Sequence, residues 1–271
     1  MTLPAPDPAF HWSHEPWGPA LHCSGLATAA QHLFTSRQLE LRAAGDAAWS
    51  AAAASLGASA DRVMRVKQVH GNVVRVLRRS EVTAAARGER PDGDAMVSNE
   101  PGLVLAVMVA DCVPILLADR KSGAAGAAHA GWRGTCARVA PAAVERLTTE
   151  FGTRPDDVIA AIGPSIGPDD YEVGEALVDA FRSAGHGPEE VARWFIRRSS
   201  RLHLDLWSAN RDQLVAAGVS PDRIFMCGLS TLAHPEVFDS YRSDGERAGR
   251  MGALIVVPEA RQATVLGRTR R

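Results

Sequence analysis

Short runs of almost entirely apolar residues recur along the chain from residue 102 onward. They lie at 102–110, 113–119, 123–130, 158–162, 223–226 and 252–257. Runs of this length without alternating polar positions are typical of strands buried on both faces. The first three follow one another directly, which predicts a three-stranded meander and departs from a strict alternation of strands and helices.

Longer stretches with a different pattern predict helices. Alanine dominates residues 42–59, which predicts a helix that ends near Gly57. Further helices are expected at 136–150, 173–184 and 206–217.

Two other segments have a less regular pattern. Residues 62–79 alternate apolar and polar side chains, which predicts a bent strand or a hairpin near His70 and Gly71. Residues 182–201 are mainly polar, and we expect them to form a surface segment.

The mixture of strand clusters and helices predicts an α/β (α+β) fold, a sandwich of mixed β-sheets flanked by helices. The chain has 271 residues, of which 46% are apolar, enough for a sizeable core. It contains no internal repeat and no clear linker. We therefore expect a single domain over 1–271, with 1–25 and 259–271 at its periphery.

Charge and cysteine content exclude several classes of function. The formal net charge of -1 provides no attraction to nucleic acid or to a membrane, so we expect neither as a partner. No apolar run approaches the roughly 20 residues of a membrane-spanning helix, and the N-terminus lacks the pattern of a signal peptide. The four cysteines are scattered, which indicates reduced thiols and a cytoplasmic location. The sequence leaves the oligomeric state open and is compatible with a monomer.

Polar residues interrupt the apolar runs at three places. Cys112 and His129 lie at ends of strand-like runs, and His70 lies where another such strand, in the alternating segment, is expected to end. Two imidazoles and a thiolate can bind zinc and leave a fourth position open, and the same set suits copper. The alternative is that Cys112 is a small hydrophobic residue and that the histidines are turn residues.

The stretch "HAGWRGT" at 129–135 combines glycines with an arginine before an expected helix. Gly131 and Gly134 indicate a tight turn whose backbone approaches a neighbouring group closely. Free N–H groups at the start of the helix would favour an anion, and Arg133 could hold a phosphate or carboxylate. The alternative is an ordinary helix start with a surface arginine.

Six motifs in order resemble the multicopper polyphenol oxidase (laccase-domain) family, also called the peptidoglycan editing factor family and described as purine nucleoside phosphorylases. The resemblance runs from about Gln31 to Val257. The motifs are "KQVHG", "ADCVPILLAD", "HAGWRG", "IGPSIGPDDYEVG", "DLWSANRDQL" and "FDSYRSDGERAGRMGAL". The resemblance implies that His70, Cys112 and His129 are the ligands of one metal ion, and that the fold is a single-domain α/β sandwich.

The chain departs from the family pattern at two places. The family's arginine matches Arg37, but "HLFTSR" continues into "QLELRAAGD" without the usual glycine-rich turn. The late motif differs at Asp239, Ser243 and Met251. We therefore expect the substrate pocket to differ from the family norm.

The resemblance implies phosphorolysis of purine nucleosides such as adenosine, inosine, guanosine and methylthioadenosine, with adenosine deamination alongside. Zinc would acidify a water molecule for attack at C6 of adenine. Arg37 and Arg133 would hold phosphate, and Asp111 or Asp94 would assist proton transfer unless these acids are structural. No two of the nine histidines are spaced as His-x-His, so a trinuclear copper centre is excluded and laccase-like oxidation would be a weak side activity.

Two other functions remain open from the sequence. A metal-free hydrolase or amidase would use Cys112 as nucleophile and His129 as base, on a peptidoglycan-related substrate. A binding protein would retain the site without turnover. We expect Cys23, Cys136 and Cys227, which lie outside the ligand motifs, to be structural.

Overall fold

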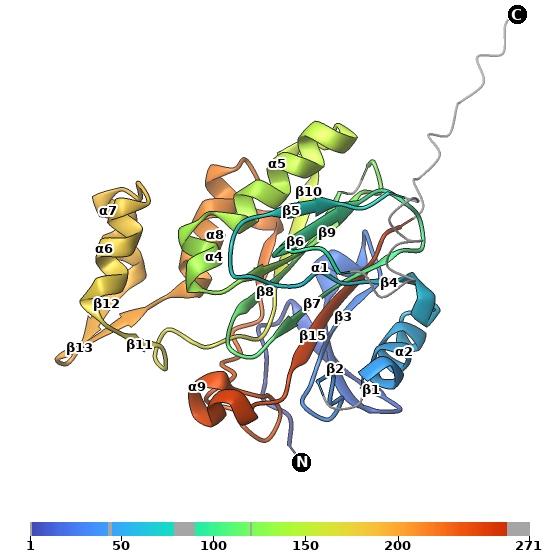
Figure 1. Ribbon diagram of the computed structural model, residues 1–271, viewed down its shortest axis with the longest axis horizontal. Helices are drawn as coiled ribbons and strands as arrows, with labels where there is room; N and C mark the ends of the chain where they lie inside the picture. Colours follow the sequence, from blue (N-terminus) through green and yellow to red (C-terminus); the bar gives the residue numbers. More distant parts are fainter. Residues whose placement is uncertain (1, 43–44, 79–89, 120, 259–271) are drawn as a thin grey trace, which may run out of the picture.

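The computed structural model describes residues 2–42, 45–78, 90–119 and 121–258. Two six-stranded sheets form its centre, with helices on the outside (Figure 1). In spatial order, the strands of the first sheet are β1 (Phe10–Glu15), β2 (Gly18–Cys23), β3 (His32–Thr35), β15 (Met251–Val256), β7 (Val104–Val109) and β4 (Val63–Met64).

The second sheet contains parallel and antiparallel pairs, as does the first. Its strands, in spatial order, are β14 (Ile224–Met226), β10 (Val158–Ile162), β8 (Val113–Asp119), β9 (Ala125–Ala130), β6 (Ala95–Ser98) and β5 (Val74–Val76). A third sheet is small and is made of β11 (Glu172–Val173), β13 (Arg201–Leu204) and β12 (Phe195–Arg198). The expected fold class, an α/β sandwich with mixed sheets, is confirmed.

The described helices are α1 (Ser24–Ala27), α2 (Gly45–Ser55), α4 (Trp132–Cys136), α5 (Val139–Phe151), α6 (Glu175–Ser183), α7 (Pro188–Trp194), α8 (Leu206–Ala216) and α9 (Tyr241–Asp244). Helix α2 covers the outer face of the first sheet, and α5 and α8 cover that of the second (Figure 1), whereas Leu26 of α1 is buried between the sheets. No helix in the described ranges is long and apolar enough to cross a membrane.

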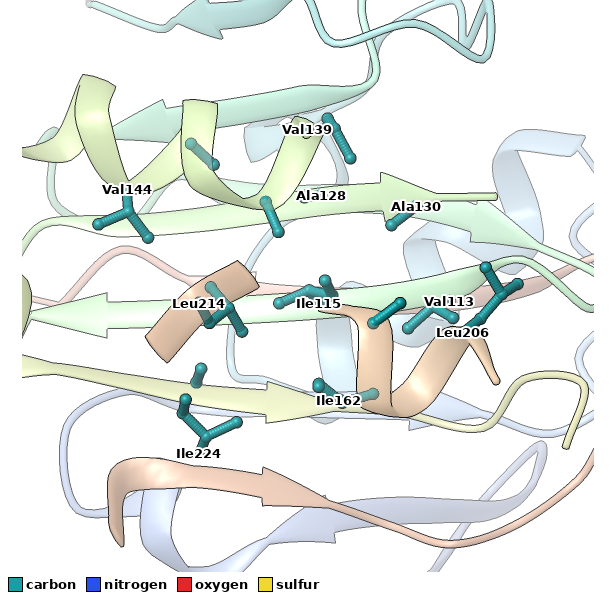
Figure 2. Close-up of a cluster of buried hydrophobic side chains, with 14 of the residues drawn as sticks. Val113, Ile115, Ala128, Ala130, Val139, Val144, Ile162, Leu206, Leu214 and Ile224 are labelled. Carbon is teal, nitrogen blue, oxygen red and sulfur yellow. The ribbon is translucent and has the colours of Figure 1, made fainter. Parts of the chain in front are cut away.

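Three apolar clusters hold these layers together, and strand residues alternate between them. Leu105 and Val107 of β7 point to the cluster between the two large sheets, whereas Val104 and Ala106 pack toward α2. In the second sheet, Ile115 of β8 belongs to the outer cluster beneath α5 and α8. Figure 2 shows this outer cluster, in which Val139, Val144, Leu206 and Leu214 of the helices pack with Val113, Ile115, Ala128 and Ala130 of the strands. Burial on both faces explains the continuous apolar runs in the sequence.

The expected three-strand meander is wrong. β8 and β9 form an antiparallel hairpin, but β7 pairs with β15 and β4 in the other sheet. The chain changes sheets between β7 and β8, where Asp111 has a positive φ of 78°. Strands that are apolar on both faces carry no pattern that identifies their partners, so proximity in sequence was a poor guide here.

The expected hairpin or bent strand over 62–79 is also wrong for its described part, residues 62–78. β4 joins the first sheet and β5 joins the second, so this segment also crosses between the sheets. The turn at His70 has a positive φ of 62°. The carboxylate of Asp94 accepts the backbone N–H groups of this turn. These groups are therefore not used in strand pairing.

Residues 182–201 are not simply a surface segment. They form α7 and β12, and the side chain of Trp194 is fully buried against the outer cluster. One apolar face of a short helix is sufficient for this packing, although most of the segment is polar. The first 25 residues, which we expected at the periphery, form β1 and β2 at the edge of the first sheet, with Leu21 and Cys23 buried. Residues 259–271 lie outside the described residues.

Candidate metal centre

The fold brings His70, Cys112 and His129 together at one end of the sandwich. Their ligand atoms all lie within 4.8 Å of one another, and the rings of His70 and His129 meet edge to face with centroids 4.9 Å apart. Cys112 directly precedes β8 and His129 is near the end of β9. Because these strands are antiparallel neighbours, with Pro114 opposite His129, the two residues become adjacent. His70 lies on a different connection between the sheets, the one from β4 to β5.

Asp94, which is fully buried, holds this arrangement in place. Its carboxylate accepts a hydrogen bond from Nδ1 of His129 at 3.0 Å. It also accepts the backbone N–H groups of Val69, His70 and Gly71 at 3.3, 2.9 and 2.6 Å. The first contact leaves Nε2 of His129 free to bind a metal, and the others fix the left-handed turn that presents His70.

The same contacts determine the protonation of the pair at the centre. Burial alone would raise the pKa of the Cys112 thiol, but the charge of His129 and hydrogen bonds from both histidines lower the pKa to about 6. Burial would lower the pKa of His129, but Cys112 and Asp94 raise it to about 9. Without a metal, the pair therefore favours a thiolate and an imidazolium at neutral pH. The thiolate is the form of cysteine that binds metals, and a metal at Nε2 of His129 would displace the proton from that nitrogen.

Gly131 allows the backbone to approach Cys112 closely. A Cβ atom at this position would lie 2.6 Å from Sγ of Cys112 and 3.6 Å from Cδ2 of His70. The backbone φ of Gly131 is −68°, which any residue can adopt, so the requirement for glycine comes from space alone. The close approach expected from "HAGWRG" is made to one of the candidate ligands.

Two cavities meet at the candidate ligands. The first, of about 420 Å³, is lined by His70 and Cys112 together with aromatic and apolar side chains that include Trp132, Tyr171 and Ile166. The second, of about 720 Å³, shares His70, Cys112 and Arg133 with the first and also contacts His129. Both volumes are within the range of small-molecule sites in proteins.

Comparisons with known proteins identify the family of the chain. A family model described as "Multi-copper polyphenol oxidoreductase laccase" matches residues 40–258. The chain belongs to this family. It is 44% identical over 207 residues to a purine nucleoside phosphorylase of Deinococcus radiodurans, covering 76% of this chain and 74% of that protein.

A second relative and a solved structure extend the comparison. The chain is 37% identical over 207 residues to adenosine deaminase RL5 from an unknown prokaryotic organism, covering 73% of this chain and 76% of that protein. The crystal structure of YlmD from Geobacillus stearothermophilus superimposes with a TM-score of 0.82 at 31% identity, covering 92% of this chain and 99% of that structure. The laccase-like family is thus represented by enzymes named for purine chemistry.

Two other residues that we expected at the laccase-family site border the cavities. Arg133 lines both, and its guanidinium lies 4.3 Å from the ring centroid of Trp132. Asp111 borders the first cavity, but its carboxylate accepts hydrogen bonds from Thr231 Oγ1, Ser240 Oγ and the N–H of Arg242. These contacts attach the segment around α9 to the wall of the cavity.

Arg37 is not brought to the candidate ligands. It lines a third cavity, donates to the carbonyl of Pro235, and lies 3.5 Å from Asp239, one of the positions that departs from the family pattern. Burial raises the pKa of the Asp239 carboxyl, and the nearby Arg37 opposes this shift. Of the other departing positions, Met251 is buried between the sheets and Ser243 is in the exposed helix α9.

Tyr171 and Arg242 line the first cavity, although neither was expected there from the sequence. The guanidinium of Arg242 lies 5.2 Å from the ring centroid of Tyr171, and Arg242 donates to the carbonyl of Glu172 at 2.7 Å. Both residues occur within motifs that carried the family resemblance. Their presence in those motifs could have indicated a role in the site. The motifs do not reveal, however, that the segments around Tyr171 and Arg242 meet in the fold.

Proposed function

We propose that the chain is a metal-dependent purine nucleoside phosphorylase that also deaminates adenosine, with weak laccase-like oxidation as a side activity. The observation that carries the proposal is the convergence of His70, Cys112 and His129 at a cavity with aromatic walls and an arginine. The names of the relatives in Deinococcus radiodurans and of RL5 support the same chemistry.

The donor set fits zinc. Two imidazoles and a thiolate are ligands that zinc prefers, and three protein ligands leave a position open, as in catalytic zinc sites. Copper accepts the same donors. When bound, zinc would supply Lewis-acid chemistry at the junction of the two cavities. Asp94 would hold the proton on Nδ1 of His129, so that Nε2 carries the lone pair that binds the ion.

The remaining side chains suit a neutral nucleoside in the first cavity. Tyr171, Trp132 and Ile166 provide the apolar and aromatic surface that a purine base requires. Burial raises the pKa of Tyr171 to about 12, so its hydroxyl remains protonated and can donate a hydrogen bond.

Arg133 would hold the attacking phosphate. In phosphorolysis, a phosphate oxygen forms a bond to C1′ while the C1′–N9 bond breaks. The base leaves with that electron pair and takes up a proton, and the other product is ribose 1-phosphate. An arginine at the junction would place the phosphate dianion against C1′ and stabilise its charge. We assign Asp111 to positioning, because its carboxylate accepts three hydrogen bonds from the protein.

A second candidate function rests on the same pair of residues. A thiolate, an imidazolium and an orienting carboxylate, in the order Cys112, His129 and Asp94, form the constellation of a cysteine hydrolase. Such an enzyme would need no metal. The edge-to-face contact of His70 with His129 favours the metal site, since a hydrolase has no need of the second imidazole.

One experiment tests the proposed function. Purified protein is analysed for metal and then incubated with phosphate and a panel of nucleosides, while free base, ribose 1-phosphate and deaminated product are resolved by chromatography. We expect one zinc per chain and phosphate-dependent release of purine base. Metal-free protein that releases no base and is alkylated stoichiometrically at Cys112 would contradict the proposal and favour the hydrolase.

A further inference from the structure

The second cavity differs from the first in the charge of its walls. Four cationic side chains line it, and one carboxylate does so. The cations are Lys67, Arg90, Arg133 and Arg250, and the carboxylate is Glu246. The cavity also reaches the candidate ligands at His70, Cys112 and His129. A group held there would be next to the metal site.

Three of the four cations have no acidic partner within the described ranges. Lys67 pairs with Asp92 at 3.4 Å. Arg250 donates to the carbonyls of Ala248 and Gly249, and Arg133 stacks on Trp132, whereas Arg90 is exposed. Carbonyls and rings leave the charge of a guanidinium uncompensated, so these residues produce a positive potential in the cavity.

The one carboxylate on the wall is already engaged. Glu246 accepts a hydrogen bond from the hydroxyl of Tyr241 at 3.0 Å, and Arg42, which is outside this cavity, lies 3.9 Å from it. Glu246 is exposed, and so are Arg90 and Arg133, so water weakens all three charges alike. The single carboxylate is outnumbered by the three arginines, and Tyr241 and Arg42 already contact it.

We propose that the second cavity is a binding site for a phosphate dianion, with Arg90 and Arg250 as the residues that select it and Arg133 as the residue that passes it to the reaction. The fork of N–H groups on a guanidinium matches phosphate oxygens, and all three arginines line this one cavity. This inference rests on the proposed function. The two substrates would then bind in different cavities, the nucleoside in the first, aromatic cavity and the phosphate in the second, basic cavity.

Direct binding of inorganic phosphate tests the proposal without any nucleoside. Zinc-loaded protein in phosphate-free buffer is titrated with inorganic phosphate by calorimetry, for the unchanged chain and for Arg250→Met, Arg250→Lys and Arg90→Met. Methionine keeps an unbranched apolar chain and removes the charge. Arg247→Met is the matched control, because Arg247 is nearby in sequence but lines the third cavity. Thermal unfolding of each variant checks the fold, and Arg90 is exposed, so its replacement should not disturb the core.

We expect Arg250→Met and Arg90→Met each to raise the dissociation constant for phosphate about 10- to 100-fold, the loss of one charge-assisted contact. Arg250→Lys should lie between Arg250→Met and the unchanged chain, and Arg247→Met should bind like the unchanged chain. Equal affinity in all variants would overturn the proposal. Binding of adenosine monophosphate without binding of inorganic phosphate would also overturn it, by assigning the cavity to a nucleotide.

Turnover measurements distinguish a failure of the phosphate site from a failure of the proposed phosphorylase activity. Phosphorolysis whose KM for phosphate is unchanged in both methionine variants would overturn the phosphate site and leave the phosphorylase. Arginine-dependent phosphate binding in a protein that releases no base would support the site and contradict the phosphorylase. Deamination consumes water, and we expect the methionine variants to retain it.

Discussion

At the scale of single residues, Asp94 organises the candidate site more than any of the ligands does. Its side chain contacts the ring of one ligand and the backbone N–H of another, and its carbonyl accepts the N–H of His129 at 2.7 Å. Residues outside the ligand set are commonly as important to a metal site as the ligands themselves. From the sequence, Asp94 was only one of two acids considered for proton transfer. Its position in the sequence does not reveal that three backbone N–H groups donate to its carboxylate.

The reactivity of Cys112 should follow the pKa of about 6. In chelator-treated protein, the rate of alkylation by iodoacetamide should rise as pH increases through about 6 and be nearly constant above pH 7.5, because the thiolate is the nucleophile. An ordinary thiol would still be gaining rate at that pH. Mass spectrometry of the alkylated peptide at a series of pH values gives the midpoint. A midpoint near pH 9 would show that His129 and His70 do not stabilise the thiolate.

Asp94→Asn provides the matched control for that measurement. The amide keeps the size of the side chain but removes the charge that helps to raise the pKa of His129. A less positive imidazole stabilises the thiolate less, so the alkylation midpoint should move to higher pH. A midpoint that moves to lower pH would contradict this reading of the site.

Gly131→Ala should damage the metal site while leaving the fold intact. The added Cβ would lie 2.6 Å from Sγ of Cys112, so the thiol must move, whereas the backbone accepts alanine without strain. We expect zinc content to fall severalfold, as measured by mass spectrometry of the dialysed protein, with an unchanged far-ultraviolet spectrum. Gly174→Ala is the control, because nothing lies within 4 Å of the new Cβ there. Full zinc occupancy in Gly131→Ala would show that Cys112 is not a ligand.

At the scale of elements, the short helix α4 depends on α8 for its position. Five residues are too few for a helix to be stable alone. From α8, Asn210 donates to Oγ1 of Thr135 at 3.0 Å and Gln213 donates to its carbonyl at 2.9 Å. Both side chains are buried. The helix that carries Arg133 is therefore held by two amides of the "DLWSANRDQL" motif.

Gln213→Leu should loosen α4 without removing a ligand. The substitution leaves the carbonyl of Thr135 without its buried donor, which should lower the free energy of unfolding by about 1–3 kcal/mol in urea. Because α4 carries Arg133, the KM for phosphate should rise while zinc content is unchanged. Arg211→Ala on the same helix serves as the control. An unchanged KM together with reduced stability would limit Gln213 to a structural role.

The sequence predicted elements better than their partners. The helices α5, α6 and α8 and the strands β10 and β15 lie within a few residues of their expected positions, because periodicity and apolar runs are local properties. Strand pairing is not local, and β1, β2 and β3 were missed since short, mixed segments carry a weak signal. The ligand set came from motifs, but the aromatic wall of the first cavity required the fold.

At the scale of the whole molecule, the candidate ligands connect the two sheets. His70 and Cys112 lie on the two connections that cross from the first sheet to the second, and His129 belongs to the second sheet. An ion bound by all three would tie both crossings to β9. Metal binding should therefore stabilise the whole sandwich and not only the loops at its end.

Zinc should accordingly raise the melting temperature. A ligand that binds only the folded state stabilises it by about 2.7 kcal/mol at a free concentration 100 times its dissociation constant. Calorimetric scans with chelator and with buffered zinc should differ by several degrees for the unchanged chain. In Cys112→Ser the two scans should nearly coincide, whereas Cys136→Ser, which changes a thiol outside the site, should behave like the unchanged chain. A zinc-dependent melting temperature in Cys112→Ser would contradict the ligand set.

Burial of the second sheet on both faces limits where this scaffold can evolve. Side chains of β8 and β9 are enclosed by the other sheet on one side and by α5 and α8 on the other, so a new polar group there would lack solvent and partners. Selection for a different ligand of the first cavity should therefore act on the segments around Tyr171 and Arg242, which border the cavity and lie outside the two large sheets. In a library of random substitutions, we expect altered substrate preference to map to those segments and inactive, insoluble variants to map to the strands.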